Sequence, residues 1–181
     1  MNFELFFESK EYWPSYNVYS GGRFSTYKDN KILFTIGYSY IKKAAQQLNT
    51  LLGKIISIDK LTSEHKIISM GHRNPQGLLY IKNLNIIINT EHGPKGGDEI
   101  NINFQEDDKI PNFGWDVSSY GTAYSGPDPF KKSHAKYGFI EPFKYYVPSI
   151  GISQMAYIPN NFSPDGEKYL FVSSLRAGSI Y

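Results

Sequence analysis

Short apolar runs separated by glycine or polar turn residues follow one another along this chain. Residues 21–37 form one such unit, in which a polar turn at 28–31 divides an apolar segment from the β-prone run at 32–36. Residues 77–90 repeat the pattern, with a turn at 82–83 and a returning apolar run at 85–89. Both units predict β-hairpins, because short β-branched runs bounded by turn residues favour strands.

The same pattern predicts three further strands and one helix. Residues 53–60, 66–70 and 166–173 are short apolar runs of the kind that form strands. In residues 40–52 the apolar positions instead recur at helical spacing before Gly53, which predicts a short amphipathic helix. Those positions are Ile41, Ala44, Ala45, Leu48, Leu51 and Leu52.

Hairpins at intervals of about fifty residues indicate small sheets repeated around an axis. The sequence therefore predicts an all-β fold, either a β-propeller or, less favoured, a β-sandwich. The length of 181 residues predicts one domain, in which residues 1–20 form no clear element.

Residues 105–142 have few apolar runs and many glycines, tyrosines and prolines. Loops longer than about 15 residues are uncommon in compact domains and are usually functional or disordered. The aromatic residues of this stretch argue against disorder, because disordered segments are poor in them. We expect an ordered, functional loop region that passes over a binding face.

Composition excludes several classes of partner and site. The formal net charge is +2 with no basic run, so a nucleic-acid partner is not expected. The chain has no cysteine, which excludes disulfides and thiolate metal ligands. It shows no recognisable signal peptide and no apolar run near the roughly 20 residues of a transmembrane segment.

The stretch at residues 71–101 holds two polar clusters joined by the second hairpin. Arg73 and Asn74 stand at one end, and Asp98 and Glu99 follow a glycine-rich loop at the other. A guanidinium group presents a planar fork of donors to carboxylates and can lie against a flat ring. This stretch predicts a site for an anionic, planar or metal-bound ligand. The alternatives are that Arg73 only ties two loops together and that the Asp-Glu pair is a solvated turn.

Several motifs carry a family resemblance in the same order along the chain. They are GGRF at 21–24, AQQLNTLLGKIISID at 45–59, GHRNPQGL at 71–78, EHGPKGGDEIN at 91–101, NFGW at 112–115, PSIGIS at 148–153 and SSLRAGS at 173–179. With these motifs the chain resembles the soluble PQQ-dependent sugar dehydrogenases, which include glucose, aldose and sorbosone dehydrogenases. The resemblance implies a six-bladed β-propeller of which three to four blades are present. It also implies a partial chain that pairs with missing blades or with a second copy as a homodimer.

The resemblance assigns roles to particular residues. Arg73 and Asn74 match the pair that holds PQQ, and Ser149 and Arg176 match weaker cofactor contacts. The carbonyls of Gly93 and Pro94 match calcium ligands, and Glu99 with the backbone of Phe113 matches a second calcium position. A small sugar or alcohol, an electron acceptor and a periplasmic location are implied in the same way.

The proton acceptor is the exception. In the family a histidine lies four residues before the arginine of the GGR motif, and here Tyr19 holds that position before Arg23. An ordinary tyrosine, with a pKa near 10, is a poor base at neutral pH. Two functions therefore stay open: a PQQ- and calcium-dependent dehydrogenase of aldose sugars or similar alcohols, or a catalytically degenerate propeller or binding module. A carbohydrate-binding surface built on Trp115 and the nearby tyrosines is a third.

Overall fold

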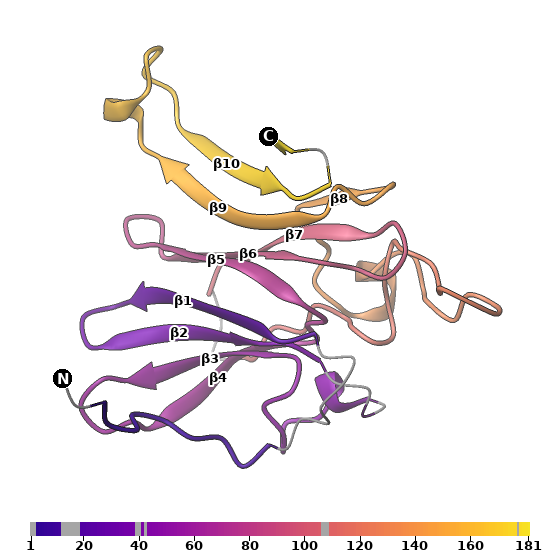
Figure 1. Cartoon of the computed structure of the whole chain (residues 1–181), viewed down its shortest axis with the longest axis horizontal. Coiled ribbons are helices and arrows are strands. Elements are labelled where there is room, and N and C mark those ends of the chain that lie inside the picture. The colour runs from indigo at the N-terminus through magenta and orange to yellow at the C-terminus, as the bar shows by residue number, and fades with distance from the viewer. Residues whose placement is uncertain (1–2, 12–18, 39–40, 42, 106–108, 177) are drawn as a thin grey trace.

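The computed structural model describes residues 3–11, 19–38, 41, 43–105, 109–176 and 178–181. Its strands form three antiparallel sheets that lie side by side (Figure 1). The first sheet has the order β1 (Gly21–Tyr27), β2 (Lys31–Ile36), β3 (Lys54–Asp59) and β4 (His65–Met70). The second has the order β5 (Pro75–Ile81), β6 (Ile86–Glu91), β7 (Asp98–Asn103) and β8 (Lys144–Tyr146). The third has the order β11 (Ser179–Ile180), β10 (Tyr169–Ser174) and β9 (Ile152–Ile158).

The sheets meet through their first strands. Strand β1 packs against β5, and β5 packs against β9, so the first strand of each sheet faces a common inner side. Sheets that repeat around such an axis are the blades of a β-propeller. The predicted all-β propeller is therefore confirmed, with two four-stranded blades and one three-stranded blade in the described part of the chain.

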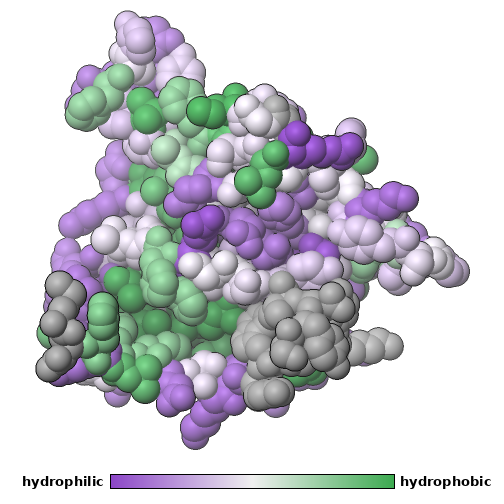
Figure 2. All heavy atoms as spheres, viewed as in Figure 1, coloured by the Kyte–Doolittle hydropathy of each residue, from purple (hydrophilic) through white to green (hydrophobic). Residues whose placement is uncertain are grey.

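The hydrophobic core lies between neighbouring blades. Leu78 and Ile87 of the second sheet pack with the first sheet, and Ile81 and Ile88 pack with the third. Successive side chains of a strand point to opposite faces, so a sheet covered on both sides needs a continuous apolar run. This requirement explains the isoleucine run of β6. On the face seen in Figure 2, further apolar side chains gather over the first sheet.

The predicted hairpins and strands are present, but the amphipathic helix over residues 40–52 is wrong. Among the described residues of this segment only the short 3-10 helix η1 (Ala44–Gln46) forms. The reason is Lys54, whose fully buried ammonium donates to the carbonyls of Ala44, Ala45 and Leu52 at 3.0, 3.1 and 2.7 Å. Main-chain oxygens that an α-helix would use internally here solvate a cation. Burial lowers the pKa of Lys54 to about 8.

The segment between β7 and β8 contains no strand in its described parts, residues 104–105 and 109–143, and one short 3-10 helix, η2 (Ala135–Tyr137). It is tied to the first sheet by paired bonds, Met70 N–H to Pro111 O at 3.0 Å and Phe113 N–H to Met70 O at 2.9 Å. A third 3-10 helix, η3 (Asn160–Phe162), lies between β9 and β10. None of the helices in the described ranges is long and apolar enough to cross a membrane.

Candidate functional site

Three loops converge at one end of the first two sheets. They are residues 71–74 between β4 and β5, residues 92–97 between β6 and β7, and residues 112–116 of the long segment. Gly71 allows the close approach: its φ is +77°, and an added Cβ would lie 2.2 Å from Asn112 Oδ1. Any larger residue would push the first and third loops apart.

Arg73 is the centre of this site and is 3% exposed. Its Nη1 donates to the carbonyls of His92 and Gly93 at 3.0 and 2.8 Å. The guanidinium carbon lies 3.8 Å from the ring centroid of Tyr19 and 5.3 Å from that of Trp115. The structure thus brings Arg73, Gly93 and Tyr19 together, with the cation close to two aromatic rings.

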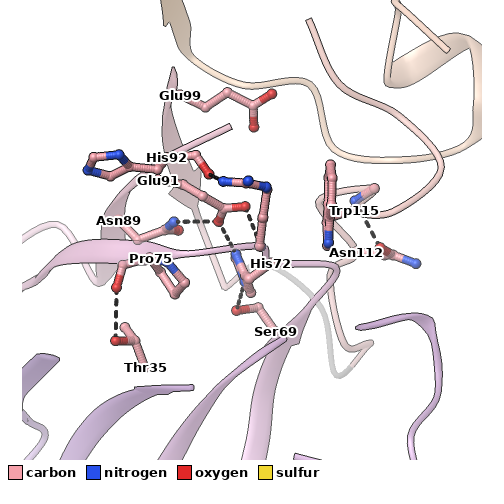
Figure 3. Close-up of polar contacts among 12 residues, drawn as sticks. Thr35, Ser69, His72, Pro75, Asn89, Glu91, His92, Glu99, Asn112 and Trp115 are labelled. Atoms are coloured by element: carbon pink, nitrogen blue, oxygen red, sulfur yellow. Dashed lines mark hydrogen bonds and ion pairs between the residues drawn. The ribbon is translucent and has the colours of Figure 1, made fainter. Parts of the chain in front are cut away.

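Glu91 fixes the main chain of Arg73, a role that the sequence reasoning missed. Its Oε1 accepts a hydrogen bond from Arg73 N at 2.6 Å, and its Oε2 lies 2.9 Å from His72 Nδ1 (Figure 3). His72 Nε2 in turn lies 2.8 Å from Ser69 Oγ. All four residues are buried. The available signal is a carboxylate at the end of a buried strand.

Glu99 lies opposite Glu91 in the register of β6 and β7 and is also buried. Burial, followed by the charge of Glu91, raises its pKa well above the ordinary value. His134 Nε2 lies 3.6 Å from Glu99 Oε1, and burial lowers the pKa of this histidine. The two groups therefore favour their neutral forms. This burial excludes the alternative of a solvated turn.

Asp98 lies toward the third sheet, as do Ser149 and Arg176, the two weaker cofactor contacts that the resemblance implies. Asp98 Oδ2 accepts hydrogen bonds from the main-chain N–H groups of Gly151 and Ile152 at 2.8 and 3.0 Å. Arg176 is exposed, and its Nη1 donates to the carbonyl of Ser149 at 3.2 Å. Ser149 and Arg176 are thus adjacent to each other, but neither lines the pocket at Arg73.

The carbonyls predicted as calcium ligands already accept hydrogen bonds. Gly93 O accepts from Arg73, and Pro94 O accepts from Gly97 N at 3.1 Å. An added Cβ on Gly93 would lie 1.7 Å from Gly97 O, so this turn requires glycine. Each carbonyl keeps a second lone pair. Among the described residues no three His, Asp or Glu side chains converge as metal ligands, so a cation here would depend on these carbonyls.

A pocket of about 500 Å³ opens beside Arg73. Five aromatic side chains contribute to its lining: Tyr19, Tyr38, Trp115, Tyr124 and Phe130. Two buried donors on its lining residues, Arg73 Nε and Trp115 Nε1, have no hydrogen-bond partner in the described part of the chain. A pocket with aromatic walls and unpaired donors fits a flat ligand that carries acceptor oxygens.

The fold is that of a β-propeller with an aromatic-walled pocket beside Arg73, and comparisons with known proteins name its family. The Glucose / Sorbosone dehydrogenase family matches residues 1–181, so the chain belongs to that family. It is 31% identical to the aldose sugar dehydrogenase YliI of Escherichia coli K12 over 170 residues, which cover 86% of this chain and 45% of that protein. It is also 31% identical over 147 residues to quinoprotein glucose dehydrogenase B of Acinetobacter calcoaceticus, covering 62% of this chain and 30% of that one.

A solved structure agrees with these relationships. The soluble aldose sugar dehydrogenase of Escherichia coli in its apo form superposes with a TM-score of 0.74 at 30% identity, over 88% of this chain and 49% of that one. The chain thus spans about half the length, or less, of the relatives it matches.

Proposed function

We propose that this chain binds PQQ and calcium as a sugar dehydrogenase-like protein that acts on aldose sugars or similar alcohols. One observation carries the proposal: two unpaired, buried donors lie beside a pocket walled by aromatic rings, next to the Arg-Asn motif. The quinoprotein named among the relatives supports a quinone as the planar ligand.

Arg73 and Asn74 would hold the cofactor. The guanidinium is already oriented by the carbonyls of His92 and Gly93, and its Nε–H is free to donate to a carboxylate. Asn74 Oδ1 accepts from Gly21 N at 3.3 Å and from Gln76 Nε2 at 2.8 Å, which orients its amide. PQQ would supply a quinone that accepts two electrons from an alcohol. Ser149 and Arg176, in loops next to the strands of the third sheet, are proposed as outer contacts.

Calcium would bind the Gly93 and Pro94 carbonyls. The nearby Arg73 cation opposes a second positive charge, because its Nη1 is only 2.8 Å from Gly93 O. Carboxylates of the cofactor would offset that repulsion, so calcium and cofactor are expected to bind cooperatively. Glu99 and the Phe113 carbonyl are proposed as a second calcium position, where the cation would stabilise the charged form of Glu99.

A second candidate function is binding without turnover, and Tyr19 favours it. This residue occupies the position at which the family resemblance places the base, and its ring lies 3.8 Å from the Arg73 guanidinium carbon. A tyrosine held against a cation offers no neutral imidazole to accept the proton of a sugar hydroxyl.

Cofactor titration tests both functions. The purified chain would receive calcium and PQQ, with binding followed by absorbance and turnover by reduction of an artificial electron acceptor with several aldoses. We expect PQQ to bind, Arg73→Lys to weaken binding at least about tenfold through loss of bidentate geometry, and the matched control Arg23→Lys to bind normally. No binding to the unaltered chain would refute the proposed function.

Turnover then separates the two candidates. Turnover by the unaltered chain would exclude the binding-only function and would make Tyr19 compatible with catalysis. Binding without turnover, together with turnover restored by Tyr19→His, would show that the site is intact except for its base.

A further inference from the structure

The indole N–H of Trp115 is a buried donor with no acceptor. Trp115 is 9% exposed, and its Nε1 has no hydrogen-bond partner among the residues that the structure describes. Buried donors in proteins are almost always paired, because the hydrogen bonds lost to water are otherwise not replaced. This N–H therefore requires an explanation.

The indole is also held in place. The Trp115 N–H of the main chain donates to Gly71 O at 3.0 Å, and its carbonyl accepts from the side-chain amide of Gln46. Its ring contacts Phe130 with centroids 5.1 Å apart and Tyr38 with centroids 5.7 Å apart. With these restraints the ring keeps its N–H in the position described, beside the family motif at residues 71–74. In Figure 3 the indole stands on the opposite side of the polar cluster from His92.

A second unpaired donor belongs to the same pocket. Arg73 Nε is buried without a partner, and the guanidinium carbon lies 5.3 Å from the Trp115 ring. Both residues line the pocket of about 500 Å³. Two donors without acceptors, on residues that line one pocket, would be satisfied by oxygen atoms that a ligand brings into it.

We propose that Trp115 is a ligand-binding residue whose indole N–H donates to a carboxylate or carbonyl oxygen of the bound molecule, alongside the Nε–H of Arg73. This inference rests on the proposed function, because PQQ with calcium is the probe that tests it. It goes beyond that function by giving Trp115 a hydrogen-bonding role in the site.

The indole signal in a proton–nitrogen correlation spectrum tests the contact directly. The chain has two tryptophans, so Trp13→Phe leaves one indole resonance, that of Trp115. On addition of PQQ and calcium we expect this signal to move downfield and its exchange with solvent to slow. Binding seen by absorbance with no change in the indole signal would overturn the role of Trp115 alone. No binding by absorbance would overturn the cofactor proposal and this inference together.

Removing only the N–H gives a second, independent readout. Replacing Trp115 by β-(3-benzothienyl)alanine keeps the ring shape and deletes the donor. The Kd for PQQ should rise roughly 10- to 100-fold, as expected for a hydrogen bond to a charged acceptor. The Tm of the ligand-free chain should stay unchanged or rise, because no bond is lost there.

Tyr27→Phe is the matched control, since it deletes a buried donor that is paired. Tyr27 Oη donates to Gln105 Oε1 at 2.5 Å, away from the pocket. This control should lower the Tm and leave the Kd for PQQ unchanged. If the Trp115 replacement behaved like the control, the N–H would be structural and the proposal would fail.

Discussion

Glu91 and Glu99 face each other across β6 and β7, yet their surroundings are opposite. Glu91 accepts hydrogen bonds from the Arg73 main chain and pairs with His72 Nδ1, at 2.6 and 2.9 Å. Glu99 Oε1 instead lies 3.6 Å from Nε2 of His134, a histidine that burial favours in the neutral form.

The difference shows how a sheet accommodates two buried carboxyl groups in register. Like charges directly opposite each other are unfavourable, so both cannot be ionised without further help. Glu91 has hydrogen-bond partners on both carboxylate oxygens, whereas burial, followed by the charge of Glu91, raises the pKa of Glu99. Glu91 thereby acts as a fixed anchor for the Arg73 loop, whereas Glu99 remains a group that a cation could ionise.

The largest expected effect comes from removing the anchor. Glu91→Ala leaves the Arg73 N–H and the His72 Nδ1 buried without their acceptor, so we expect a loss of about 3–5 kcal/mol in the free energy of unfolding. Urea denaturation measures this loss. Glu167→Ala, at an exposed glutamate, is the control and should change stability by less than about 0.5 kcal/mol. Equal effects of the two substitutions would show that Glu91 anchors nothing.

A gain in stability is expected on the opposite strand. The raised pKa of Glu99 means that its stabilising contribution is complete below the ordinary glutamate value of 4.5 and is lost as pH rises through the folded-state pKa. Glu99→Gln stays neutral and should therefore unfold with a free energy higher by about 1 kcal/mol at neutral to mildly alkaline pH.

Below pH 4.5 the Glu99→Gln variant and the unaltered chain should be equally stable, because Glu99 is then protonated in both folded and unfolded states. Denaturant unfolding over a pH series provides the comparison. A variant that is less stable at every pH would mean that Glu99 is held ionised, contrary to the direction given above.

Calcium should reverse the difference in stability between the unaltered chain and the Glu99→Gln variant. If the cation binds at Glu99, it will raise the Tm of the unaltered chain and not that of Glu99→Gln. Binding at the Gly93 and Pro94 carbonyls alone would raise both Tm values equally. Thermal unfolding with millimolar calcium, and with magnesium as the control ion, therefore distinguishes the two positions; an unchanged Tm in both chains argues against either.

The sequence predicts the elements that depend on neighbouring residues better than those that depend on contacts with distant parts of the chain. The hairpins at 21–37 and 77–90 follow from local turns and apolar runs, and both are present. The helix over 40–52 fails because its apolar spacing says nothing about Lys54, which takes the carbonyls of that segment from outside it.

The site is less predictable than the strands. Motif resemblance selects Arg73, Asn74 and Gly93, and the structure brings Arg73 and Gly93 into contact. The opposition of Glu91 and Glu99 depends on strand register, which a shift of one residue would abolish. The unpaired N–H groups of Arg73 and Trp115 are properties of packing, and no spacing along the chain reveals them.

An effect of about the same size as that of Glu99→Gln is expected at the far end of the Glu91 network. Ser69, His72 and Glu91 follow the hydrogen-bond order of a nucleophile, a base and its orienting carboxylate. Ser69 is only 1% exposed, however, so no substrate could reach its hydroxyl. We expect Ser69→Ala to lower the free energy of unfolding by about 0.5–1.5 kcal/mol and to leave PQQ binding unchanged.

A serine-directed fluorophosphonate tests directly whether a reagent can reach the Ser69 hydroxyl. It should not label the folded chain at Ser69, because the hydroxyl is buried and hydrogen-bonded with His72 Nε2. Labelling that disappears in Ser69→Ala would instead reveal a reachable nucleophile. In that case the network around Glu91 would be a second reactive site, and its role as the anchor of Arg73 would no longer explain why the three residues are aligned.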